Sequence, residues 1–125
     1  MKRFLFPFFL FWVTVSFAQN LAENEQWAYN HYQKKSVYIR MRDGIQLYTT
    51  IYSPKDNKGV HAILLNRTPY SIGPYNDKFN GRLFNSYWIE YLRKGYVIVQ
   101  QDVRGKWMSE GVFEDVRPFN PNKKN

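Results

Sequence analysis

The chain has 125 residues, a formal net charge of +8 and no cysteine. The absence of cysteine excludes disulfides, a thiol nucleophile and a sulfur-ligated metal site, so a hydrophobic core must hold the fold together. The basic residues are scattered and form no stripe or basic helix, and nucleic-acid binding is therefore not expected despite the high isoelectric point.

Residues 1–18 have the layout of a secretory signal peptide. Lys2 and Arg3 precede a nearly continuous apolar run, and the tripeptide SFA (16–18) places small residues at positions −3 and −1 of a cleavage site. The apolar run is about a dozen residues long, whereas a bilayer-spanning helix needs roughly 20. We expect cleavage after Ala18 and export to the periplasm or the medium, with no membrane span afterwards. An uncleaved membrane anchor is the alternative.

Residues 19–35 form a polar leader without clear periodicity. Its aromatic side chains Trp27, Tyr29 and Tyr32 are suited to docking on a folded domain. We expect the leader to pack against the domain, and a turn of helix would suit it.

The stretch SVYIRMRDGIQLYTTIYSP (36–54) predicts an antiparallel hairpin. Residues 37–42 and 45–52 alternate between two faces on either side of Asp43-Gly44. An Asp-Gly pair between two segments of period two is a strong hairpin signal, because glycine accepts the positive φ that the turn requires.

The segment from residue 60 to residue 102 predicts a strand–helix–strand unit. The sequence VHAILLNR (60–67) is apolar in its middle, as expected for a strand covered on both faces, and YVIVQQD (96–102) is similar. Between them, large apolar residues recur at helical spacing over 83–92, and the Arg-Lys-Gly sequence at 93–95 is a typical helix end. A short link then implies two parallel strands joined by a right-handed crossover.

A hairpin leading into a parallel unit is the opening of a mixed α/β sheet. Such a sheet needs further strands and helices to cover both of its faces, and the residues after Asp102 are mostly turn-forming. We therefore expect residues 36–125 to be an incomplete domain, the amino-terminal part of a longer protein. The alternative is a small autonomous domain that buries its sheet against a partner.

The loop NRTPYSIGPY (66–75) lies between the predicted third strand and first helix. In the α/β-hydrolase fold, the loop at that place supplies part of the oxyanion hole. Pro69 restricts its own backbone and that of Thr68, so a stiff turn presents Tyr70. The Tyr70 hydroxyl is a suitable donor to a developing oxyanion, although most loop tyrosines only pack.

Three segments resemble the start of a known family of enzymes. MRDGIQLYTTIYSP, RTPYSIGPY and GYVIVQQDVRGKWMSEG, in this order, resemble the α-amino-acid ester hydrolases, which group with cocaine esterases and X-prolyl dipeptidyl-peptidases. The resemblance implies an α/β-hydrolase domain with a Ser-Asp-His triad, a helical cap and a jelly-roll domain. It also implies that the hydroxyl of Tyr70 is one oxyanion donor, the other being the backbone N–H after the nucleophile. No cofactor or metal is implied.

The nucleophile that the resemblance requires is missing from this sequence. That serine lies on a Gly-x-Ser-x-Gly elbow, and no such pentapeptide occurs. Ser109 lacks the first glycine, and Ser71 is not followed by a helix that would form an elbow. The chain order Ser, Asp, His therefore places the triad beyond Asn125, and we expect this chain alone to be inactive.

The remaining polar residues near the two strand ends are expected to be structural. Asp102 is predicted to form an ion pair with Arg104 that fixes the loop around Gly105, and Arg67 is predicted to hold the preceding loop through its guanidinium donors. Trp107 could line a pocket or roof the core.

Glu110 is also predicted to be structural. His31 and His61 lie far apart in the sequence and have no metal-ligand spacing, so surface or packing roles are expected for both.

The function that these observations favour is hydrolysis of an acyl bond in a small ester or amide. An X-Pro dipeptidyl-peptidase acting on short peptides is the alternative among enzymes, and a non-catalytic binding module with aromatic loops is the alternative of another class. A homo-oligomer is compatible with the sequence.

Overall fold

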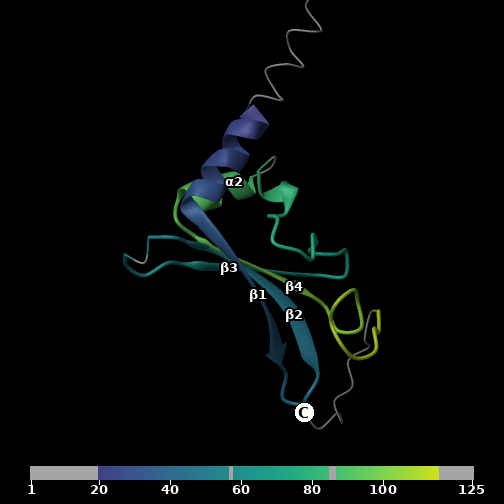
Figure 1. Ribbon diagram of the computed structural model, residues 1–125. Helices are drawn as coiled ribbons and strands as arrows, with labels where there is room; N and C mark the ends of the chain where they lie inside the picture. The colour runs from purple at the N-terminus through teal and green to yellow at the C-terminus, as the bar shows by residue number, and fades with distance from the viewer. Residues whose placement is uncertain (1–19, 57, 85–86, 116–125) are drawn as a thin grey trace, which may run out of the picture.

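The computed structural model describes residues 20–56, 58–84 and 87–115, so the predicted signal peptide lies outside the described residues. A helix over residues 20–31 leads directly into the first strand. The labelled elements that follow are β1 (Tyr32–Arg40), β2 (Gln46–Pro54), β3 (Ile63–Thr68), the 3₁₀ helix η1 (Gly81–Leu83), α2 (Trp88–Arg93) and β4 (Val97–Asp102) (Figure 1).

The strands form one mixed sheet in the order β1-β2-β4-β3. β1 and β2 are antiparallel, β2 and β4 are antiparallel, and β3 and β4 are parallel. The predicted hairpin and the predicted parallel pair are both confirmed. β4 lies between them, so the hairpin and the strand–helix–strand unit share one sheet.

The hairpin closes at the predicted Asp-Gly position. Gly44 has φ +88° and donates its N–H to the Met41 carbonyl at 3.0 Å, while the Met41 N–H reaches the Ile45 carbonyl at 2.8 Å. β1 begins at Tyr32, so the last residues of the segment expected to be a leader are strand. In place of the expected turn of helix, the segment forms a helix over residues 20–31 that is followed directly by β1.

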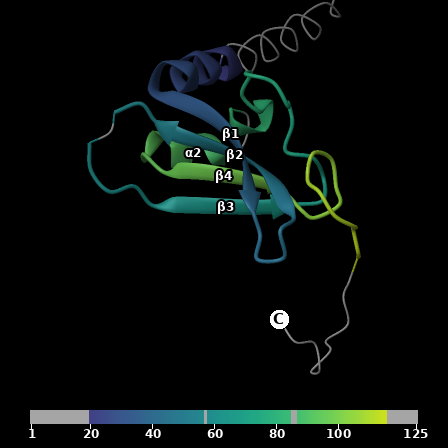
Figure 2. The ribbon, with the colours of Figure 1, turned by 60° about the horizontal axis from the view of Figure 1, so that its bottom comes forward.

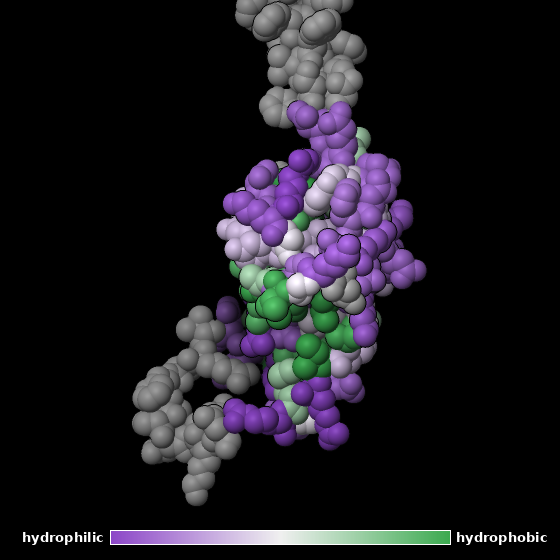
Figure 3. Space-filling model, turned by 90° about the vertical axis from the view of Figure 1, so that its left-hand side faces the viewer, coloured by the Kyte–Doolittle hydropathy of each residue, from purple (hydrophilic) through white to green (hydrophobic). Residues whose placement is uncertain are grey.

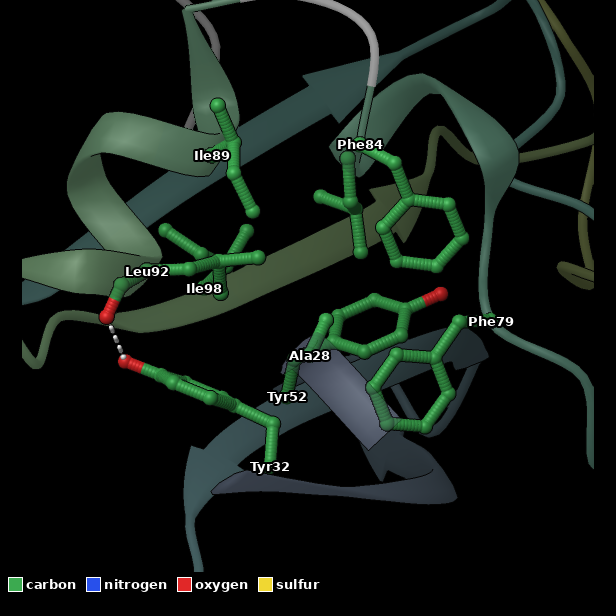
Figure 4. Close-up of a cluster of buried hydrophobic side chains, with 9 residues drawn as sticks. Ala28, Tyr32, Tyr52, Phe79, Phe84, Ile89, Leu92 and Ile98 are labelled. Atoms are coloured by element: carbon green, nitrogen blue, oxygen red, sulfur yellow. Dashed lines mark hydrogen bonds between the residues drawn. The ribbon is translucent and has the colours of Figure 1, made fainter. Parts of the chain in front are cut away.

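The hydrophobic core lies on one face of the sheet (Figure 4). The buried cluster contains Ala28 of the first helix, Tyr32, Tyr52 and Ile98 of the strands, and Phe79, Leu83, Phe84, Ile89 and Leu92 of the segment that includes η1 and α2. The single hydrogen of the Tyr32 hydroxyl is shared between the Leu92 carbonyl at 2.8 Å and the Tyr96 carbonyl at 2.9 Å, which joins β1 to the end of α2. Figure 2 shows α2 behind the sheet.

The other face of the sheet has no helix against it within the described residues. Ile63 and Leu65 of β3 are 68% and 54% exposed, so the prediction that this strand is covered on both faces is wrong for the described part of the chain. The reason is that Ile63 and Leu65 lie on the face opposite Leu64, which packs on the cluster, and no described helix covers that face. Hydrophobic residues also gather at the surface in the view of Figure 3.

The predicted amphipathic helix over 83–92 is shorter than its periodicity indicated. η1 and α2 are separate elements, with residues 85–86 between them outside the described part. Leu83, Phe84 and Leu92, three of the residues that recur at helical spacing, are buried as expected, whereas Tyr87 of the same pattern is 65% exposed. The helix ends as predicted: Gly95 has φ +79° and its N–H reaches the Leu92 carbonyl at 2.9 Å.

Candidate active site

The two parallel strands end side by side, which brings their following loops together. Thr68 and Asp102 are register partners at the ends of β3 and β4, and the Val103 N–H donates to the Thr68 carbonyl at 3.2 Å. The carboxyl edge of parallel strands is where α/β folds place their ligand sites. The loops after these strands, residues 69–75 and 103–109, therefore form the candidate site.

Tyr70 lies on the first of these loops with its side chain open to solvent. The side chain is 76% exposed, and its hydroxyl makes no hydrogen bond to any described residue. The Thr68 hydroxyl accepts a hydrogen bond from the Tyr70 N–H at 3.0 Å, which tightens the turn at Pro69. The loop thus holds the Tyr70 backbone and leaves its hydroxyl available as a donor.

Asp102 binds the loop after Tyr70 and not the arginine that the sequence suggested. Its Oδ1 accepts the Ile72 N–H at 3.1 Å, and its Oδ2 accepts the Tyr75 hydroxyl at 2.9 Å. Arg104 instead forms an ion pair with Asp43 of the hairpin turn at 2.8 Å. The predicted pair does not form because Asp102 is fully buried, and a guanidinium would enter that site only at a large desolvation cost.

Burial governs the ionisation of both members of this contact. Asp102 is fully buried, and this desolvation raises the pKa of its carboxyl above the ordinary value, while the hydrogen bonds from Tyr75 and Ile72 oppose the rise. Burial also raises the pKa of Tyr75 to about 12, to which the neighbouring Asp102 adds. The Tyr75 hydroxyl therefore remains a donor to Asp102 over the physiological range.

The second loop reaches back to the first through Trp107. Its indole N–H donates to the Pro69 carbonyl at 2.9 Å, and its side chain is 62% exposed. Of the two predicted roles for Trp107, roofing the core does not fit this exposure within the described residues. Trp107 thereby fixes the carbonyl of Pro69, the residue that precedes Tyr70.

The rest of the second loop is tied to the hairpin. Glu110 accepts the Gln46 N–H at 2.9 Å through its carboxylate, and its own N–H donates to the Gln46 carbonyl at 3.0 Å. A Cβ on Gly105 would lie 2.1 Å from the backbone nitrogen of Phe113, so only glycine fits there. The structural role predicted for Glu110 agrees with these contacts, and the Gly105 loop is held by backbone packing.

Neither serine near the site has the surroundings of a nucleophile. The Ser109 hydroxyl donates to the Asp102 carbonyl at 2.8 Å and accepts the Tyr48 N–H at 2.9 Å. Its donor and its acceptor capacity are thus both used by hydrogen bonds within the fold. Ser71 has φ +56°, and its hydroxyl lies 3.0 Å from the Tyr75 hydroxyl. Within the described residues, both hydroxyls therefore have structural contacts.

Three other polar residues were considered from the sequence: His31, His61 and Arg67. His31 and His61 each place Nδ1 2.8 Å from a backbone carbonyl, that of Trp27 and that of Gly95 respectively. The Arg67 side chain makes no hydrogen bond or ion pair with a described residue, so its predicted role in holding the loop is wrong there. No group of three or more side chains suited to a metal ion occurs within the described part of the chain.

Lys34 is a loop-holding residue that the sequence did not reveal. Its ammonium donates to the carbonyls of Pro74, Asn76 and Lys78 at 2.8, 2.6 and 2.7 Å. Burial lowers the pKa of this amine, and Asp77 partly compensates. The alternation of β1 predicts that Lys34 lies on the same face as Tyr32. Nothing in the sequence indicates that its partners are three carbonyls distant in the chain.

The comparisons with known proteins bear directly on these two loops. The family model described as X-Pro dipeptidyl-peptidase (S15 family) matches residues 43–122, which includes both loops. The chain belongs to this S15 family. A curated relative in sequence is the cocaine esterase of Rhodococcus sp. (strain MB1 Bresler), 38% identical over 87 residues. That match covers 67% of this chain and 14% of the esterase.

Two solved enzyme structures match the fold as well. An α-amino acid ester hydrolase superimposes with a TM-score of 0.61 at 37% identity, and an aminopeptidase from the marine sediment archaeon Thaumarchaeota archaeon with a TM-score of 0.53 at 33% identity. Each match covers 76% of this chain and 17% of the other. The mixed sheet is thus part of an α/β-hydrolase fold, as predicted, and the chain spans about a sixth of these structures' length.

Proposed function

We propose that this chain is the oxyanion-hole segment of a serine hydrolase that cleaves an acyl bond in a small ester or amide. The observation on which the proposal rests is the exposed Tyr70 hydroxyl on a loop whose backbone is held by Thr68 and Trp107. Fixing the backbone beneath this donor reduces the reorganisation needed when negative charge develops on the substrate oxygen. The match of the S15 family model across the same loop supports the proposal.

The mechanism assigns one task to this chain. A serine supplied by the complete protein attacks the carbonyl carbon, and its hydroxyl proton passes to a histidine base. The carbonyl oxygen becomes an oxyanion, to which the Tyr70 hydroxyl donates a hydrogen bond. The leaving alcohol or amine takes the proton from the histidine, and water then releases the acyl group by the same steps.

The substrates we propose are esters or amides of α-amino acids. Two matched structures are named an α-amino acid ester hydrolase and an aminopeptidase, and both names refer to substrates that carry an α-amino group. A dipeptidyl-peptidase acting on X-Pro peptides is the second candidate, which the family description favours. Any carboxylates that bind the amino group would be supplied by the complete protein.

The test uses the complete protein that contains this chain. Purified protein is assayed on a phenylglycine methyl ester, on the N-acetylated form of that ester, and on an X-Pro nitroanilide. We expect hydrolysis of the free amino ester with little activity on the acetylated one, and inactivation by a serine-reactive fluorophosphonate. Dominant cleavage of the X-Pro amide would select the second candidate, and no hydrolysis of any of the three would leave the binding-module alternative.

We also propose that the protein is exported. The support is the basic, apolar and small-residue pattern of residues 1–18. No helix among the described residues is long and apolar enough to cross a membrane. Amino-terminal sequencing of protein from the cell envelope and the medium should begin at Gln19, and a mature protein that begins at Met1 would contradict cleavage.

A further inference from the structure

Both oxygens of the Asp102 carboxylate are used by the loop that follows Tyr70. Oδ1 accepts the Ile72 N–H and Oδ2 accepts the Tyr75 hydroxyl, at 3.1 and 2.9 Å. Asp102 is 0% exposed and Ile72 is 2% exposed, so this contact is shielded from water. A carboxylate held this way costs free energy to bury unless its hydrogen bonds are kept.

The network extends from Asp102 to the residue next to Tyr70. The Tyr75 hydroxyl lies 3.0 Å from the Ser71 hydroxyl, which also accepts the Gly73 N–H at 3.1 Å. Ser71 has φ +56°, a left-handed conformation that costs free energy in a residue with a side chain. The surrounding hydrogen bonds maintain that conformation, and the conformation of Ser71 sets the direction in which the chain leaves Tyr70.

Asp102 is also the best-anchored residue from which such a network could be built. It is the last residue of β4, it pairs in register with Thr68 at the end of β3, and its carbonyl accepts the Ser109 hydroxyl at 2.8 Å. β4 lies inside the sheet between β2 and β3. The loop is therefore anchored to an inner strand of the sheet and not to another loop.

We propose that Asp102 is a positioning residue for the oxyanion hole: its carboxylate holds residues 71–75 so that the Tyr70 hydroxyl is presented in one place. This inference rests on the proposed function. It assigns Asp102 no contact with substrate, because both of its oxygens face the loop. Asp102 acts only through Tyr70.

The test is a double-mutant cycle in the complete protein, with Asp102→Ala, Tyr70→Phe and the pair. A donor misplaced by about 1 Å can cost up to 10²-fold in rate, so Asp102→Ala should lower kcat by roughly 10- to 100-fold with little change in KM. In the Tyr70→Phe background the same change should lower kcat by less than about threefold, because the hydroxyl it positions is gone. An equal loss in both backgrounds would overturn the proposal, since it would show an effect independent of Tyr70.

Conservative replacement and a matched control sharpen the test. Asp102→Asn keeps an oxygen for the Ile72 N–H and offers an amide to the Tyr75 oxygen, so it should recover most of the lost kcat. Glu25→Gln, which neutralises an exposed carboxylate of the helix over residues 20–31, outside both loops, should leave kcat unchanged. If Asp102→Ala does not fold, Tyr75→Phe removes one arm of the network and should show the same dependence on Tyr70.

Amide hydrogen exchange gives a readout that does not depend on activity. The peptide over residues 70–79 should exchange faster in Asp102→Ala than in the natural protein, and Asp102→Asn should restore its protection. If the complete natural protein hydrolyses no substrate, the proposed function fails while faster exchange still supports the loop contact. Unchanged exchange together with unchanged kcat in Asp102→Ala would overturn the positioning role.

Discussion

Tyr70 differs from the other tyrosines of the two loops and the core by what its hydroxyl does. The hydroxyls of Tyr32, Tyr52 and Tyr75 each contact a backbone or carboxylate group of the fold, and Tyr32 and Tyr52 are fully or nearly fully buried. The Tyr70 hydroxyl contacts no described residue, and its side chain is 76% exposed. A rigid backbone under a free hydroxyl is the arrangement that an oxyanion donor requires.

Replacing Tyr70 with Phe tests this donor directly in the complete protein. We expect kcat to fall by roughly 10²–10³-fold, the range for one oxyanion donor, because the bond strengthens as charge develops. KM and the melting temperature should change little, since an exposed hydroxyl is removed. Steady-state kinetics with a melting curve measures both, and Tyr87→Phe, at a tyrosine 65% exposed on the approach to α2, is the matched control.

Tyr32 illustrates the opposite use of a tyrosine hydroxyl. Burial raises its pKa to about 12, with a smaller contribution from Asp56. Because the folded value exceeds the ordinary value of 10.0, the resulting stability is complete below pH 10 and is lost as pH rises through 12. The hydroxyl also satisfies the carbonyls of Leu92 and Tyr96, which the Phe variant would leave without this donor.

We therefore expect Tyr32→Phe to lower the free energy of unfolding by roughly 0.5–1.5 kcal/mol at neutral pH, the net contribution of a typical buried hydrogen bond. Between pH 10 and 12 the gap to the natural protein should narrow, because only the natural protein loses stability by ionising this group on unfolding. Urea unfolding of the complete protein at several pH values measures the gap. A gap that widens with pH would contradict the raised pKa.

At the scale of elements, Ser109 joins the second loop to two strands. Its hydroxyl bridges the Asp102 carbonyl of β4 and the Tyr48 N–H of β2 in a site only 8% exposed. This bridge completes the sheet end where β2 and β4 stop pairing directly, after Thr49 and Gln101. A side chain of the loop therefore replaces the next backbone hydrogen bond between β2 and β4, at the end of the sheet where the candidate site lies.

Replacing Ser109 with Ala should cost roughly 1–3 kcal/mol of unfolding free energy, because a buried N–H and a buried carbonyl lose their shared partner. Ser36→Ala, on exposed β1, is the control: its hydroxyl lies 3.4 Å from that of Thr50, and we expect a much smaller loss. Denaturant unfolding of the complete protein measures both variants. Equal stability of Ser109→Ala and the natural protein would show that the bridge contributes nothing net.

At the scale of the whole molecule, one face of the sheet is only partly covered within the described residues: Leu47, Thr49 and Gln101 are buried on it, but apolar residues of β1 and β3 are not. The buried cluster joins the first helix, η1 and α2 to one face, while Ile63, Leu65 and Ile39 remain 68%, 54% and 39% exposed. Exposed apolar surface along an edge strand invites association with another chain. This chain spans 14–17% of the length of the relatives that it matches. Those proteins therefore contain many further residues that are available to cover such a face.

Residues 19–125 expressed alone should therefore fold poorly or associate. We expect sedimentation velocity to show concentration-dependent oligomers and a hydrophobic dye to bind strongly. Ile63→Lys with Leu65→Lys, both on the exposed side of β3, should reduce association without loss of the hairpin. A monomer with a sharp cooperative melting transition and no dye binding would contradict this expectation and favour an autonomous domain.

The sequence by itself determined the elements whose cause is local. The Asp-Gly turn, the alternation on either side of it and the glycine at the end of α2 depend on backbone conformations that neighbouring residues impose, and Gly44 and Gly95 adopt the expected positive φ. The parallel pairing of β3 with β4 also followed, because a helix between two apolar strands allows few connections. The motif around Tyr70 likewise places the loop correctly between strand and helix.

The tertiary structure alone decided which distant groups meet. Asp102 binds Ile72 and Tyr75 in place of Arg104, and Lys34 binds three carbonyls some forty residues away, at separations of 40, 42 and 44 positions. Many charged side chains have suitable chemistry for such contacts. The choice among them depends on which distant segment packs against each face of the sheet and on how much water each side chain loses there, and local pattern encodes neither.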